Sequence, residues 1–144
     1  MQRRSFLAAA VGLAAGPFVA SAWGQSARKK TILLRSAWDT VNIGDIGHTP
    51  GTLRVFEQYL PEVDVVLWPS LINEKIETLL RKRFPKLGFV RGGLETAGKQ
   101  GSDVTQAIAA ADLVVHNSSM SQGLTLPRVC REMGKPFGWF GQSF

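Results

Sequence analysis

The sequence is poor in residues that would support disulfide, metal or nicotinamide chemistry. Cys130 is the single cysteine, so no disulfide can form within the chain. The thiol lies in an expected helix, where both a buried inert thiol and a reactive or intermolecular one are open. The two histidines, His48 and His116, have no metal-ligand spacing. The dinucleotide pattern G-x-G-x-x-G does not follow the first expected strand, so no cofactor is predicted.

Acidic residues are fewer than basic ones, yet the excess does not indicate a nucleic-acid surface. The chain has 17 Lys and Arg against 11 Asp and Glu, a net charge of +6. The basic residues are scattered, and the one tight cluster, 81–83, falls at an expected helix end, where cations complement the helix dipole. No aromatic residues are interleaved with it, as a nucleic-acid surface would need. We therefore predict no nucleic-acid partner.

A long apolar run is also missing. The longest one, residues 6–20, is shorter than the roughly 20 residues of a membrane-spanning helix. It follows Arg3-Arg4 and is followed by small residues, which is typical of a twin-arginine export signal. We predict that residues 1–24 are such a signal, with cleavage before Trp23 or Gln25, and that the protein is periplasmic. An uncleaved signal would anchor it in the membrane, the only membrane contact expected.

The rest of the chain, 28–144, alternates short apolar runs with helical patterns. The expected strands are 32–38, 63–68, 87–90, 113–116 and 137–140. The first expected helix has Thr49 as its N-cap and Pro50 at its first position, and the later helices cover about 74–84, 103–111 and 126–133. Their expected end signals are Asn73 as a cap, Ser102 or Asp103 as a cap, and Gly134 as a C-terminal stop. The expected buried face of the helix over 74–84 consists of Ile76, Leu79, Leu80 and Phe84. This alternation predicts one α/β domain, a Rossmann-like, mostly parallel sheet with helices on both faces.

The loop after the first expected strand carries the most suggestive polar residues. Gly44 permits a close backbone approach, Asn42 can donate and accept hydrogen bonds, and Asp45 can accept from a sugar hydroxyl or act as a general base. His48 can donate to an anion or simply close the loop. Free N–H groups of residues 51–53 would suit an anion. The alternative is that Asn42 and Asp45 only tie the turn together.

Two later strand ends carry weaker candidates. Arg91 precedes two glycines, where a guanidinium can reach an anionic ligand or remain a surface charge. Asn117 and Ser118 follow the fourth expected strand, directly after His116, whose expected role is structural. The tryptophans at positions 38 and 68 end strands and either stack on a sugar or pack in the core. In a parallel sheet, all these strand ends meet at one edge.

The order of motifs resembles the N-terminal half of the polysaccharide pyruvyl transferase family. The most specific stretch is 42–51, NIGDIGHTPG, followed by ADLVV at 111–115, GKP at 134–136 and GQS at 141–143. The resemblance implies two Rossmann-like halves facing a cleft, as in GT-B glycosyltransferases. The chain would then be one half, incomplete at its C-terminus, and would need the missing half or a second copy of itself.

The resemblance also implies a reaction, in which an enolpyruvyl group passes from phosphoenolpyruvate to two hydroxyls of a cell-surface polysaccharide. The product is a pyruvate ketal. Whether this chain is an enzyme stays open, because a non-catalytic glycan-binding module or a glycosyltransferase half using a nucleotide sugar would fit as well. The expected catalytic residues are Asp45 and His48, and the expected substrate contacts are Asn42, Gly44, Arg91, Asn117 and Ser118.

Overall fold

The computed structural model describes residues 28–36, 43–117 and 124–141. The expected signal, Trp38, Asn42 and Ser118 lie outside these ranges. The elements, in chain order, are β1 (Thr31–Ser36), α1 (Ile43–Tyr59), β2 (Asp64–Pro69), α2 (Glu74–Arg83), β3 (Gly88–Phe89), the 3-10 helix η1 (Leu94–Thr96), α3 (Asp103–Ala110), β4 (Leu113–His116), α4 (Thr125–Glu132) and β5 (Phe137–Trp139). No helix in the described part of the chain is long and apolar enough to cross a membrane.

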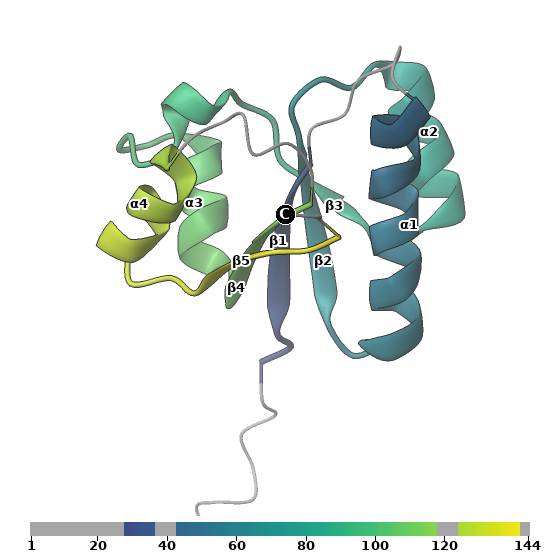
Figure 1. The fold of residues 1–144 in the computed structure, drawn as a ribbon, viewed down its shortest axis with the longest axis horizontal. Helices are drawn as coiled ribbons and strands as arrows, with labels where there is room; N and C mark the ends of the chain where they lie inside the picture. The colour runs from purple at the N-terminus through teal and green to yellow at the C-terminus, as the bar shows by residue number, and fades with distance from the viewer. Residues whose placement is uncertain (1–27, 37–42, 118–123, 142–144) are drawn as a thin grey trace, which may run out of the picture.

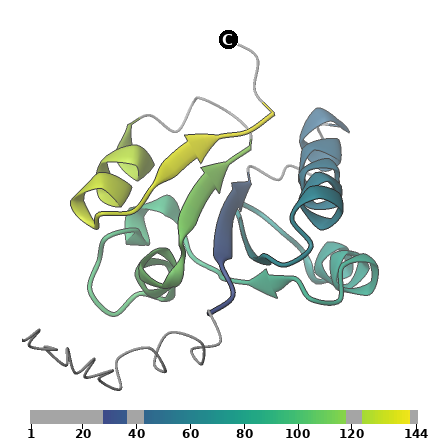
Figure 2. The ribbon, with the colours of Figure 1, turned by 90° about the horizontal axis from the view of Figure 1, so that it is seen from below.

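The five strands form one sheet in the order β3-β2-β1-β4-β5, and every neighbouring pair is parallel. Figure 1 shows α1 and α2 on one side of this sheet and α3 and α4 on the other. The view from below in Figure 2 shows the same two layers of helices with the strands between them. The predicted α/β Rossmann-like fold is therefore confirmed.

The first part of the central strand β1 is rich in apolar residues, Ile32 to Leu34, because both faces of the strand are buried. Leu33 and Leu34 are neighbours in sequence and fully buried, but they point to opposite sides of the sheet. Leu34 packs in the core under α1 and α2, while Leu33 packs in the core under α3 and α4. Burying each such side chain contributes roughly 2 kcal/mol, so β1 holds both layers together.

Helix ends follow the local sequence signals at three places. The Asn73 side chain accepts a hydrogen bond from the Ile76 N–H at 2.9 Å and caps α2. Ser102 caps α3 in the same way, through the N–H of Thr105 at 3.1 Å. Gly134 follows α4 with a φ of 64°, a left-handed conformation that glycine adopts without strain. All three ends were predicted.

The start of α1 was predicted wrongly. The helix begins at Ile43, so Thr49 and Pro50 lie inside it. Thr49 is no N-cap because its side chain is buried and its hydroxyl is hydrogen-bonded to that of Ser36 on β1. Pro50 has no N–H to donate to the Ile46 carbonyl, one turn earlier. The free N–H groups of this helix consequently belong to its first turn, near residue 43, and not to residues 51–53 as expected.

One residue of the predicted buried face of α2 is also misplaced. Leu80 and Phe84 are buried and Ile76 is half-buried, but Leu79 is 54% exposed. Helix α2 leads into β3, an edge strand of two residues, so little sheet is available to cover a wider apolar face. The helix therefore buries a narrower stripe than its sequence offers.

Candidate functional site

The topology creates a switch point between the carboxyl ends of β1 and β4. These strands are neighbours in the sheet, and the chain continues from β1 into α1 on one face and from β4 into α4 on the other. In open α/β sheets, ligands bind at such a place because the two connections diverge and leave a crevice. Both loops singled out in the sequence follow these two strands.

Polar residues meet on the α1 side of this switch point. The Asn117 side-chain amide donates to the His48 carbonyl at 3.3 Å and to the Thr52 hydroxyl at 3.0 Å. In return, the His48 Nδ1 lies 3.1 Å from the Asn117 backbone carbonyl oxygen. Asn117 is buried, whereas His48 is exposed. The structure thus brings together two predicted site residues that lie 69 positions apart in sequence.

The His48 contact fixes the chemistry of its ring. A carbonyl oxygen only accepts hydrogen bonds, so Nδ1 carries the proton in this contact. In the neutral ring, Nε2 then keeps its lone pair and can accept a proton. Because His48 is exposed, this nitrogen can meet a ligand from solvent. The Asn117 carbonyl orients the ring, and the amide of the same residue holds the backbone of α1 at His48.

A buried hydrogen bond between the Ser36 and Thr49 hydroxyls fixes α1, which carries His48, to the end of β1. Both side chains are fully buried. Ser36 ends β1 and Thr49 lies inside α1, so the bond joins the helix to the carboxyl end of the strand. The role of these two residues is structural, and it explains why the chain departs from the locally favoured helix start.

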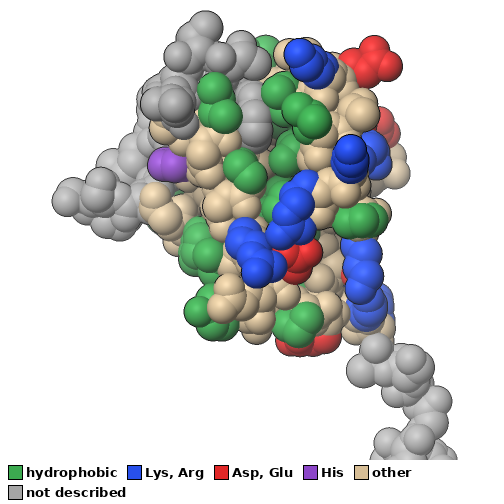
Figure 3. Space-filling view, turned by 90° about the vertical axis from the view of Figure 1, so that its right-hand side faces the viewer, with side chains coloured by type: hydrophobic (Ala, Val, Ile, Leu, Met, Phe, Trp, Pro, Cys, Tyr) green, Lys and Arg blue, Asp and Glu red, His purple; other side chains and the backbone are tan. Residues whose placement is uncertain are grey.

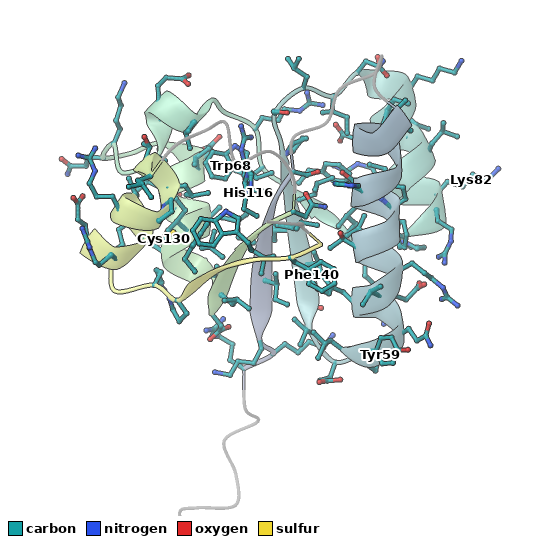
Figure 4. The ribbon with its side chains drawn as sticks, in the orientation of Figure 1. Tyr59, Trp68, Lys82, His116, Cys130 and Phe140 are labelled. Carbon is teal, nitrogen blue, oxygen red and sulfur yellow. The ribbon has the colours of Figure 1, made fainter. Side chains whose placement is uncertain are left out.

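On the face of the sheet covered by α3 and α4, four large side chains form a row across the strands: Trp68, Arg35, His116 and Trp139. Strand register aligns Arg35 with Trp68 on one side and with His116 on the other, and aligns His116 with Trp139. The Arg35 guanidinium lies 4.4 Å from the Trp68 ring centroid, and Trp68 Nε1 donates to the Gly92 carbonyl at 2.7 Å. Figure 4 shows Trp68 and His116 near the middle of the sheet, on the side of α3 and α4.

Burial sets the charge states in this row. Desolvation lowers the pKa of Arg35 to about 10, against a smaller opposing effect of Glu95, so the guanidinium stays charged at neutral pH. Desolvation, with a contribution from Arg35, lowers the pKa of His116 to about 4, so its imidazole is neutral. The row therefore contains a buried positive charge near the carboxyl end of β1, on the face of the sheet opposite to the His48–Asn117 pair.

Sequence reasoning missed Arg35. The signal was present, because Arg35 is the one charged residue in the otherwise apolar run ILLRS that forms most of β1. It also missed Trp139, whose side chain is 45% exposed at the carboxyl end of β5 and meets the Phe137 ring edge-on at 4.9 Å. An exposed tryptophan of this kind offers an apolar face to a sugar ring.

The other predicted site residues with a place in the described part of the structure are Gly44, Asp45 and Arg91. Gly44 and the backbone of Asp45 lie in the first turn of α1, while the Asp45 side chain lies outside the described part of the structure. Arg91 follows the edge strand β3, two strands away from β1, and forms an ion pair with Glu77 of α2. It is not brought to the His48–Asn117 pair. Substrate contact by these residues stays a prediction.

Two of the open alternatives are resolved by burial. Trp68 is fully buried, so it packs in the core and does not stack on a sugar. Cys130 is also fully buried, and burial raises the pKa of its thiol to about 11, as expected for an inert thiol. Among the described residues, no group of three or more His, Cys, Asp or Glu side chains is placed to hold a metal ion.

No protein-family model matches the chain, and no curated protein matches it either.

Proposed function

We propose that this chain is a pyruvyl-transferase-like protein that acts on cell-surface polysaccharide. The observation that carries the proposal is the oriented His48 ring at the switch point, held by Asn117 with Nε2 available as a base. Phosphoenolpyruvate is the proposed donor because the family resemblance implies it. Export to the periplasm belongs to the same proposal.

The reaction needs a base and a proton source. One sugar hydroxyl loses its proton and attacks C2 of the enolpyruvyl unit, while C3 of that unit gains a proton and becomes a methyl group. The second hydroxyl then adds to C2 and loses its proton to the departing phosphate as the C2–O bond to phosphate breaks, which gives the ketal and inorganic phosphate. In our proposal His48 Nε2 or Asp45 accepts the hydroxyl proton, and Asn42, Gly44 and Ser118 contact the sugar. Arg91 would act as a more distant contact.

The test is phosphate release from phosphoenolpyruvate by the full chain, with an unpyruvylated polysaccharide as acceptor. NMR of the product would show the new ketal methyl group. We expect at least one of the variants His48→Gln and Asp45→Asn to lower the rate at least 100-fold, the range of a lost general base. Gln58→Ala, an exposed change on the same helix, is the matched control and should leave the rate unchanged. No phosphate release with any acceptor would contradict the transfer reaction.

A glycan-binding module is the second candidate, and exposed Trp139 favours it. This candidate predicts retention on a polysaccharide column without phosphate release. Trp139→Ala should then abolish retention, whereas Tyr59→Ala, which removes another exposed aromatic ring at the end of α1, should not. Retention that survives Trp139→Ala would contradict this second candidate.

A further inference from the structure

A second hollow lies at the opposite end of the sheet from the switch point. It is a depression of about 250 Å³ between the later turns of α1, the start of β2 and the segment that joins α2 to β3. Most of its lining is apolar, including Leu53, Phe56, Leu60, Val65, Phe84 and Leu87. Figure 3 views the molecule from the side of α1 and α2 and shows hydrophobic side chains exposed between basic ones.

The walls of this depression belong to the core and are therefore already formed. Leu53, Phe56 and Leu87 are between 3% and 6% exposed and pack in the cluster beneath α1 and α2. Apolar walls of this kind favour an apolar occupant, because its burial removes hydrophobic surface from water. A cavity of about 150 Å³ holds a benzene ring, so about 250 Å³ has room for roughly ten carbon atoms.

Two charged residues, Glu57 and Lys86, are among the residues that line the depression. Glu57 is the one acidic residue among those described in the lining, and it accepts hydrogen bonds from Arg54 at 2.8 Å and from Arg83 at 2.9 Å. These bonds lower the pKa of Glu57 to about 2, so its negative charge is permanent but compensated twice. Lys86 also lines the depression, and within the described ranges no carboxylate is paired with its ammonium group.

We propose that this depression binds a small amphiphilic carboxylate, with an apolar body of about ten carbons on the core residues and the carboxylate on Lys86 Nζ. Apolar walls and a free cation at their rim fit the two ends of one such molecule. The site is separate from the switch point and does not depend on the function proposed there.

The test is calorimetric titration of the full chain with sodium decanoate below its micelle concentration, with decanol as the uncharged comparison. We expect saturable binding of decanoate and weaker binding of decanol. Lys86→Gln keeps most of the side-chain length and should weaken decanoate binding about three- to fivefold, the range of a partly exposed ion pair. Lys82→Gln is the matched control, because Figure 4 shows Lys82 on the outer side of α2.

A second variant fills the hollow itself. Val63 is half-buried in its lining, and Val63→Phe should abolish decanoate binding, with circular dichroism to confirm that the fold is retained. If Val63→Phe does not fold, Lys86→Gln at its exposed position still decides the outcome. Absence of saturable decanoate binding would overturn the proposal. Equal binding by wild type and Lys86→Gln, or equal binding of decanol and decanoate, would overturn the anionic ligand.

Discussion

The two histidines, His48 in α1 and His116 at the end of β4, differ in burial and in hydrogen-bond partners. His48 lies on the α1 side, exposed, with Nδ1 on a backbone carbonyl. His116 lies in the row on the other face, buried beside a permanent cation. The first is oriented by a backbone carbonyl and open to solvent, and the second is held neutral inside the fold. The two histidines therefore differ in chemistry because their burial and their partners differ.

The largest predicted effect is a difference in the free energy of unfolding between variants of Trp68 and Trp139, the buried and exposed ends of the row that also contains Arg35 and His116. Trp68→Ala removes a fully buried ring and its bond to the Gly92 carbonyl, so we expect a loss of about 4 kcal/mol in the free energy of unfolding. Trp139→Ala at the exposed end should cost less than about 1 kcal/mol. Urea unfolding followed by circular dichroism measures both. Similar losses would mean that the row is not buried as described.

The pH dependence of stability should distinguish the two histidines. The pKa of His116 is lowered from 6.5 to about 4 in the folded state, so the unfolded chain binds the proton more tightly. The folded state is most stable, with respect to this group, above pH 6.5, where His116 is neutral in both states. This stability is lost as the pH falls from 6.5 toward 4, because the unfolded chain then binds a proton that the folded chain does not. Its full size is roughly 3 kcal/mol, since a tenfold change in proton affinity is about 1.36 kcal/mol.

Urea unfolding between pH 7 and about pH 5.5 measures the first part of this loss, in a range above most of the usual titration of carboxylates. His116→Gln should remove most of the pH dependence, whereas His48→Gln should leave it in place. A wild-type stability that does not change over this range would show that His116 is not held neutral by burial.

A smaller effect concerns the joint between β1 and α1. Thr49→Val keeps the side-chain shape but leaves the buried Ser36 hydroxyl without the bond to Thr49, at a cost of about 1–2 kcal/mol. The double variant Ser36→Ala with Thr49→Val should recover part of this loss, because neither polar group is then buried alone. A double variant as unstable as the sum of its singles would contradict a direct bond.

Much of the fold follows from local sequence. The buried runs predicted all five strands to within a few residues, since turn-forming residues bound each run. Asn73, Ser102 and Gly134 marked helix ends because capping uses neighbouring residues only. Thr49-Pro50 is an equally good local start signal, yet α1 begins earlier. The Thr49 hydroxyl is hydrogen-bonded to the distant Ser36 and does not cap the helix. A tertiary contact of this kind has no local signature.

The candidate site was predictable in part. Parallel topology was enough to expect the loops after β1 and β4 at one edge, and the His48–Asn117 pair fulfils that expectation. The partner of each His48 ring atom depends on the angle between α1 and the sheet, which the sequence does not specify. Arg35 escaped notice because its significance comes from register with Trp68 and His116 on neighbouring strands.

The most direct measurement is NMR of the histidine ring nitrogens in the ¹⁵N-labelled protein near neutral pH. The account predicts that His48, when neutral, carries its proton on Nδ1, as the contact with the Asn117 carbonyl requires. Asn117→Ala should leave that tautomer in place, because the acceptor is a backbone oxygen, although the loss of the side-chain amide should loosen the ring. A neutral His48 with its proton on Nε2 would contradict the account, since Nε2 would then have no lone pair to act as the proposed base.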